Sequence, residues 1–453
     1  MTKNFMSMLG RLHARLGDFW WYSLMLFCAC RAADLLNAFV GLWLVPKYVD
    51  PSELGAVLPL TNFANFLALP AAAFANAFRN ELTRLSINHE FGKLKTLMRG
   101  VFVATAIFLF LAIVAARFTL PLFLERIRIV EGSFGSLIII ASFLTTIAPV
   151  YSNALQALKK FKEYSLMNII GAPVRFLAMF ATMPFRALSG YFVGQAAMPM
   201  FTIASSFLCL RKELSVPAKS YWNKAVVKKF LWLFTIFAMS GIANGTIGLV
   251  ETTVIRQRLP ELESAGYYMA TRFSDIASFL FGPLVFTIFP FTANLAASGK
   301  DMRPLIFKAT GAVLVFCALI AGFFTLFGKP LLSILPNGEQ YCAYWWVIPW
   351  QIGFHVTGAL IGFYTTAEIS TNRFSFMKWM TPLDIIYSTL LLLVTGHGYF
   401  VGILPVSCTE FLYVHNIFSL ESMLWWMTAF NVIKVLGCFI AMAVQRPPLI
   451  HKA

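Results

Sequence analysis

Residues 19–45 are FWWYSLMLFCACRAADLLNAFVGLWLV, an apolar stretch long enough to cross a membrane as a helix, because about 20 residues span the hydrocarbon core. Arg31 and Asp34 interrupt this stretch near its middle. A charge at the bilayer centre costs roughly 2.5–3.5 kcal/mol on insertion scales, so such residues usually face a protein interior or a water-filled cavity. The stretch therefore predicts a membrane-spanning helix whose charged face is turned away from lipid.

Apolar stretches of this kind recur along the whole 453-residue chain. Hydrophobic residues make up 59% of the chain and charged residues only 12%, against about 25% charged residues in soluble domains. We therefore predict an all-α, polytopic membrane protein with about twelve transmembrane helices. The candidate spans are residues 19–45, 55–84, 95–117, 133–158, 164–186, 189–210, 227–256, 264–295, 305–328, 342–370, 375–396 and 419–445.

Positively charged residues are distributed unevenly between the two sides of these spans. With the N-terminus inside, 24 of the 36 lysines and arginines fall in cytoplasmic segments and 8 in outer segments. Cytoplasmic loops carry such an excess, so we expect a multi-pass protein of the cell inner membrane with both termini in the cytoplasm. The net charge of +16 lies mostly in short loops, where it acts as a topology signal, and we expect no nucleic-acid partner.

The largest basic cluster, residues 211–229 (RKELSVPAKSYWNKAVVKK), lies midway along the chain. We predict a cytoplasmic linker that contacts anionic lipid headgroups through Lys224, Lys228 and Lys229. It separates an N-lobe over residues 1–210, with an interfacial helix at residues 5–16 and six spans, from a C-lobe over residues 230–453 with six further spans.

The two predicted lobes resemble each other. Aligning Gly55 with Gly266 gives an offset of 211 residues and brings the early spans of the two lobes into register. An even number of spans in each lobe keeps both copies in the same orientation, so a pseudo-twofold axis along the membrane normal should relate them. Substrate sites in such folds lie between the repeats near the midplane.

Seven of the ionisable residues within the predicted spans are singled out as site candidates, and four of these seven are cations, which indicates a cavity for an anionic ligand. A guanidinium stays charged and binds two phosphate oxygens at once. We predict that the four cations bind substrate and that the three carboxylates orient them or exchange coupling ions, either protons or sodium. The cations are Arg31, Arg175, Arg272 and Lys434, and the carboxylates are Asp34, Asp275 and Asp384.

Three structural alternatives stay open for these residues. Arg272 and Asp275 repeat the i,i+3 spacing of Arg31 and Asp34, and each pair could be a local salt bridge that only lowers the cost of insertion. Lys434 could extend its ammonium to the membrane interface. Asp384, near the inner end of its predicted span, could be solvated.

Catalytic signatures are absent from the sequence, which has no Walker A, HExxH, zinc CxxC, GxSxG or EF-hand motif. His355, His397 and His415 are scattered, and a lone histidine in a membrane protein is more often a packed or interfacial residue than a ligand. The outer segment at residues 397–418 is too short and apolar to hold an active site. We therefore expect a transporter and not an enzyme, with no cofactor and no metal site.

Several motifs carry a resemblance to a known family. They are residues 50–55 (DPSELG) before a helix that ends in Arg79-Asn80-Glu81-Leu82, residues 157–164 (ALKKFKEY) before Asn168, and residues 264–272 (SAGYYMATR) followed by Phe289-Pro290. In this pattern the chain resembles the Wzx-type polysaccharide (O-antigen) flippases of the multidrug/oligosaccharidyl-lipid/polysaccharide exporter superfamily, whose fold is MATE-like.

The resemblance implies two six-helix lobes around a central cavity that opens alternately to each side. Members move undecaprenyl-pyrophosphate-linked oligosaccharides outward, with a cationic lumen that contacts the pyrophosphate. The related lipid II flippase carries arginines in its first and eighth helices, which makes Arg31 and Arg272 the strongest candidates here. That flippase typically has two more C-terminal helices, and their absence favours the Wzx type.

Two other functions stay open. One is a cation-coupled multidrug exporter of the same fold, although drug cations would favour an acidic cavity. The other is a membrane polymerase or ligase that acts on the same lipid-linked sugars, although such an enzyme should carry a substantial outer loop.

Overall fold

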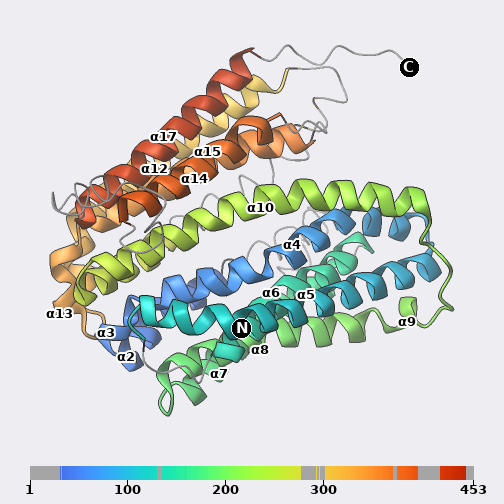
Figure 1. Cartoon of the computed structure of the whole chain (residues 1–453), viewed down its shortest axis with the longest axis horizontal. Helices are drawn as coiled ribbons and strands as arrows, with labels where there is room; N and C mark the ends of the chain where they lie inside the picture. The colour runs from blue at the N-terminus through green and yellow to red at the C-terminus, as the bar shows by residue number, and fades with distance from the viewer. Residues whose placement is uncertain are drawn as a thin grey trace, which may run out of the picture. The chain divides into compact units, whose positions relative to one another are not determined.

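The computed structural model describes residues 31, 33–129, 135–158, 160–276, 292, 295, 301–370, 375–395 and 419–444. In these residues the chain is helical throughout, with short turns and no strand (Figure 1). The described residues therefore confirm the prediction of an all-α fold. The interfacial helix at residues 5–16, most of the first span and the segment at residues 397–418 lie outside them.

The chain forms two compact units, and each is interleaved in sequence. Unit 1 comprises Met1–Val40, Leu67–Pro121 and Glu131–Ala238, and unit 2 comprises Gly41–Phe66, Leu122–Val130 and Met239–Ala453. The division into lobes at residues 211–229 stays a prediction.

Unit 1 is built from long helices. Residues 33–39 continue the first span, and α7 and α6 both pack against α8. The helices are α4 (Val57–Ile87), α5 (Phe91–Arg126), α6 (Gly135–Ala157), α7 (Phe161–Thr182), α8 (Ala187–Cys209), the short α9 (Arg211–Leu214) and α10 (Lys224–Arg258), of which α4, α5 and α10 also contribute to unit 2.

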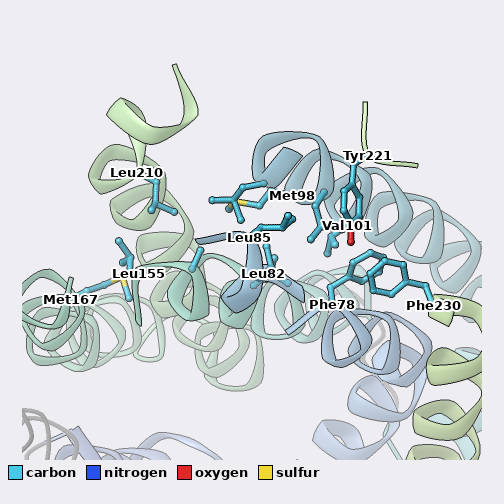
Figure 2. Close-up of a cluster of buried hydrophobic side chains, with 14 residues drawn as sticks. Phe78, Leu82, Leu85, Met98, Val101, Leu155, Met167, Leu210, Tyr221 and Phe230 are labelled. Carbon is cyan, nitrogen blue, oxygen red and sulfur yellow. The ribbon is translucent and has the colours of Figure 1, made fainter. Parts of the chain in front are cut away.

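A hydrophobic core holds together one end of unit 1 (Figure 2). Phe78 stacks on Phe230 with ring centroids 4.1 Å apart, and Trp222 meets Phe78 edge-on at 5.9 Å. Tyr221 is also buried in this cluster, so the predicted basic linker supplies aromatic side chains to the core. Its exposed Lys224 and Lys228 stay candidates for contact with lipid headgroups.

Unit 2 contains the helices of the C-terminal part. The π-helical turn η1 (Val40–Leu44) begins one residue before the first segment of unit 2 and continues into it. Among the C-terminal helices, α14 packs against both α12 and α17. The other elements are α2 (Val45–Tyr48), α3 (Pro51–Leu54), a helix over residues 261–276, α12 (Arg303–Ser333), α13 (Gly338–Tyr341), η2 (Cys342–Tyr344), α14 (Val347–Ser370), α15 (Met377–Thr395) and α17 (Leu420–Val444).

The two aligned repeat motifs meet within unit 2. Asp50 caps α3 by accepting hydrogen bonds from the Ser52 hydroxyl at 2.6 Å and the Ser52 amide at 2.8 Å, which hold the pKa of Asp50 below its ordinary value. A Cβ on Gly55 would lie 2.1 Å from Ser264 Oγ, so this glycine permits close contact between the motifs.

Eight helices of the described residues are long and apolar enough to cross a membrane: Pro51–Ala73, Phe91–Arg126, Gly135–Ser152, Lys162–Thr182, Ala187–Cys209, Val226–Arg258, Arg303–Ser333 and Leu420–Met442. α5 and α12 expose large apolar side chains such as Phe110, Phe118, Leu319 and Leu326, as a lipid-facing surface requires. The fold is that of a polytopic membrane protein. α14 (24 residues) and α15 (19 residues) are long enough to span but are not among these eight, and the total of twelve spans stays a prediction.

Gly190 offers a test of the packing between α7 and α8. A Cβ on Gly190 would lie 2.5 Å from the Met183 nitrogen and 2.6 Å from the Met183 Cα. These are backbone atoms, which cannot move aside as the end of a flexible side chain can. Gly190→Ala should therefore lower stability by about 1–3 kcal/mol, as overpacking does. The measurement is thermal unfolding of purified protein in detergent.

The matched control is Gly311→Ala in α12, where an added Cβ meets nothing within 4 Å. Its unfolding temperature should equal or exceed that of the wild type, because alanine is the better helix former. Equal unfolding temperatures for Gly190→Ala and the wild type would contradict the close approach.

Candidate functional site

The first helix and α7 form a polar group inside unit 1. Arg31 Nη2 lies 3.1 Å from Asp34 Oδ2, and Arg175 Nη1 donates to Asn37 Oδ1 at 2.9 Å. Arg31, Asp34 and Asn37 follow one another at i+3 spacing, so they share one helix face. Phe39 and Phe176 meet next to them with ring centroids 6.1 Å apart. Three of the predicted site residues thus lie on two neighbouring helices.

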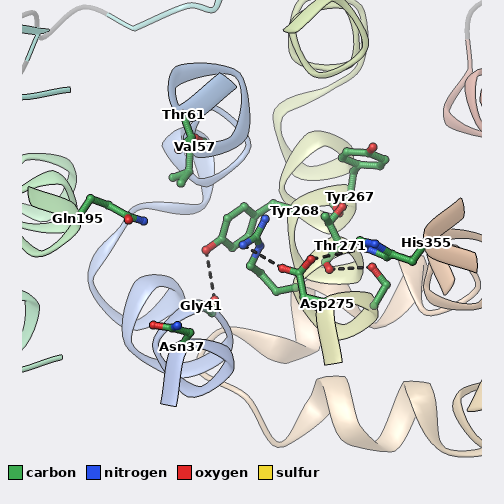
Figure 3. Close-up of polar contacts among 12 residues, drawn as sticks. Asn37, Gly41, Val57, Thr61, Gln195, Tyr267, Tyr268, Thr271, Asp275 and His355 are labelled. Atoms are coloured by element: carbon green, nitrogen blue, oxygen red, sulfur yellow. Dashed lines mark hydrogen bonds and ion pairs between the residues drawn. The ribbon is translucent and has the colours of Figure 1, made fainter. Parts of the chain in front are cut away.

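A second polar group lies in unit 2, on the helix over residues 261–276 and on α14 (Figure 3). Arg272 Nη1 lies 3.0 Å from Asp275 Oδ2, which is the local salt bridge that the i,i+3 spacing left open. His355 Nε2 from α14 faces the other carboxylate oxygen, Asp275 Oδ1, at 3.5 Å. The Arg272 guanidinium also lies over the ring of Tyr268, 5.4 Å from its centroid, in cation–π geometry.

The π-helical turn η1 borders this second group. Tyr268 Oη donates to the Gly41 carbonyl at 3.3 Å, which gives a partner to backbone in a non-α turn. A Cβ on Gly41 would lie 2.8 Å from Arg272 Cδ, so the absence of a side chain lets Arg272 lie against the turn. Single π-turns are frequent at functional sites, and this one packs directly against a predicted substrate-binding residue.

A third polar group is buried between α10, α15 and α17 of unit 2. Lys434 Nζ lies 2.7 Å from Asp384 Oδ1, and both side chains are buried. Tyr387 stacks on Phe430 with centroids 3.9 Å apart and donates to Glu251 Oε1 at 2.8 Å. Lys434 therefore does not extend to an interface, and Asp384 is not solvated.

Several of these partners were missed at the level of sequence. Asn37, Tyr268 and Tyr387 are uncharged, and the sequence favours a packed or interfacial role for His355. The i+3 spacing of Asn37 after Asp34 was a usable signal, whereas no spacing connects His355 with Asp275 or Tyr387 with Glu251. The substrate-binding and coupling roles of the seven charged residues stay predictions.

The described residues hold no group of three histidine, cysteine, aspartate or glutamate side chains that could bind a metal ion. The polar groups instead combine arginine, lysine and carboxylate with tyrosine and amide side chains, which suits anion binding and proton exchange.

Solved transporters share this fold. An inward-facing multidrug resistance MATE family transporter of the MOP superfamily superposes with a TM-score of 0.66 at 11% identity, covering 91% of this chain and 94% of the other. An outward-facing structure of such a transporter gives 0.53 at 11% identity, covering 92% of each chain. A MOP superfamily transporter from Pyrococcus furiosus, described as having a binding pocket of reverse polarity, gives 0.53 at 12% identity, also with 92% coverage of each chain.

No family model and no curated protein matches the sequence. At these identities the superpositions define the class of fold, that of MATE transporters, and they leave the substrate to be argued from the residues of this chain.

The buried pair of Lys434 and Asp384 allows a test of stability. Lys434→Met leaves Asp384 without its cation inside the bundle and should cost about 3–5 kcal/mol, because an uncompensated buried charge is strongly destabilising. Replacing both residues, with Lys434→Met and Asp384→Leu, should cost much less. Thermal unfolding of the single and double variants in detergent gives the coupling energy.

Lys308→Met serves as the control, because Lys308 is an exposed lysine of α12. It should unfold with the wild type. If the single Lys434→Met variant is as stable as this control, the prediction is wrong, because Lys434 then does not neutralise the charge of Asp384 in the folded protein.

Proposed function

We propose that this protein flips a polyprenyl-pyrophosphate-linked oligosaccharide from the inner to the outer leaflet during cell-surface polysaccharide biosynthesis. The observation that carries the proposal is that Arg31, Arg175 and Arg272 lie on helices, within stretches predicted to span the membrane, and that each is engaged by a side chain of the protein. Charges inside a membrane helix are costly and mark substrate or ion pathways.

Arginine chemistry favours a phosphorylated headgroup over other anions of the membrane. The guanidinium presents parallel N–H groups that match two phosphate oxygens, and it stays charged in apolar surroundings. Arg272 belongs to unit 2, and Arg31 and Arg175 belong to unit 1, so each unit carries guanidinium groups suited to a phosphate. Lys434 is the weaker candidate among the four cations because it is buried, whereas Arg31, Arg175 and Arg272 are partly exposed.

Transport in this proposal follows alternating access, for which the MATE fold is solved in inward-facing and outward-facing forms. Coupling to a proton or sodium gradient would use the carboxylates that accompany the arginines, Asp34 and Asp275, or the buried Asp384. The positive-inside bias supports a location in the inner membrane with both termini cytoplasmic.

A multidrug exporter is the second candidate, because several solved structures with this fold are multidrug MATE transporters. A drug cation requires unneutralised carboxylates, whereas Asp34, Asp275 and Asp384 each lie within about 3.1 Å of a cation. The Pyrococcus furiosus transporter with a pocket of reverse polarity supports a different substrate class on this fold.

The test is translocation in proteoliposomes that contain a fluorescent lipid-pyrophosphate oligosaccharide. Arg31→Ala and Arg272→Ala should each lower the rate about tenfold or more, because a hydrogen bond to a charged group contributes about 1.5–3 kcal/mol. The lysine variants should recover part of the rate, since an ammonium cannot bind two phosphate oxygens in the same plane.

Arg211→Gln is the control, because Arg211 is an exposed arginine of the short α9 and should leave the rate unchanged. Wild-type rates for both alanine variants would contradict the proposal. Extrusion of a cationic dye by the wild type, without movement of the lipid, would favour the multidrug exporter.

A further inference from the structure

The polar group around Arg272 contains a third titratable side chain, His355, beside the ion pair of Arg272 and Asp275. Arg272 binds one oxygen of Asp275 at 3.0 Å, and His355 faces the other oxygen at 3.5 Å. A charge-assisted hydrogen bond measures about 2.7–2.9 Å, so the distance from His355 to Asp275 is longer than that of a protonated imidazole bound to a carboxylate. His355 Nε2 is buried and has no hydrogen-bond partner among the described residues.

The charge of this group depends on His355. With a neutral imidazole, Arg272 and Asp275 cancel, and the group offers no net attraction to an anion. A proton on Nε2 adds one positive charge to the group and places an N–H toward Asp275 Oδ1. Histidine is the side chain whose charge ordinarily changes between about pH 5 and 8.

Asp275 and Arg272 are the charged groups that chiefly act on His355 in the described part of the chain. The helices α12 and α17 also pack against α14 and carry further charged residues. These residues are Arg303, Lys308 and Lys329 on α12 and Glu421 and Lys434 on α17.

We infer that His355 is a positioning residue whose protonation converts the neutral Arg272–Asp275 pair into a cationic site for the substrate's phosphate groups. The protonated imidazole holds one Asp275 oxygen, which weakens the hold of the carboxylate on Arg272 and leaves the guanidinium to the anion. Binding of the anion then favours uptake of a proton, because the two effects are thermodynamically reciprocal. This inference rests on the proposed function, since it assumes that Arg272 contacts the phosphorylated headgroup.

The experiment measures anion binding to the full chain in detergent by titration calorimetry between about pH 5 and 8. The probes are inorganic pyrophosphate and ethane-1,2-disulfonate, and the charge of the disulfonate stays constant over this range. Titrations in buffers of different ionisation enthalpy report the protons taken up with each anion. Wild-type protein should bind the disulfonate about tenfold more tightly at the acidic end, within the usual range of coupling energies, and should take up protons.

His355→Asn should abolish both the proton uptake and the acid-dependent gain in affinity, with a change of less than about twofold over the range. His355→Lys, which keeps a cation at this place, should hold the tight affinity at every pH. The control is His89→Asn at an exposed turn, where the backbone φ is 56° and asparagine is well tolerated, and it should behave as the wild type.

Wild-type proton uptake and pH dependence in His355→Asn would overturn the inference. If His355→Asn fails to fold, Asp275→Asn decides the question, because it leaves the imidazole in place and removes the negative charge. It should bind the disulfonate about tenfold more tightly than the wild type at the neutral end, and unchanged affinity there would overturn the inference. Undiminished binding by Arg272→Ala would instead reject the proposed function, since Arg272 would then not contact the anion.

Discussion

The pairing of arginine with a carboxylate one helical turn away is the interaction on which this structure depends. A bare guanidinium on a membrane helix carries a cost of several kcal/mol, and a partner at i+3 on the same face lowers that cost before any tertiary contact forms. Arg31 with Asp34 and Arg272 with Asp275 use the same arrangement in different units. The chain can therefore insert charged helices and still hold arginine where a polar substrate could reach it.

Much of the fold follows from the amino-acid pattern. Apolar runs of sufficient length predicted the helices, and eight of those in the described residues meet the requirements of a membrane span. The i,i+3 spacing left a local salt bridge open for both arginine pairs, and the structure shows both contacts, because partners on one helix are placed by local geometry. The resemblance to polysaccharide flippases implied a MATE-like fold, and solved MATE transporters superpose over nine-tenths of the chain.

Contacts between side chains of different helices could not be predicted from the sequence. Asn37 with Arg175 and His355 with Asp275 join residues whose proximity depends on packing. The lysines of the basic segment at residues 211–229 predict contact with lipid headgroups, whereas its Tyr221 is buried in a hydrophobic core and the exposed Trp222 packs against Phe78 of that core. The many lysines of the segment determine the prediction made from its composition, but a buried aromatic ring contributes more to the stability of a core.

The central claim is that the partly buried Arg31, Arg175 and Arg272 bind the phosphates of a lipid headgroup. An electron cryomicroscopy structure with a bound polyprenyl-pyrophosphate oligosaccharide tests it most directly. The account predicts phosphate oxygens within hydrogen-bond distance of the Arg272 guanidinium, with the Arg272–Asp275 contact lengthened. A headgroup bound elsewhere, with Arg272 still held by Asp275 at its present 3.0 Å, would contradict it.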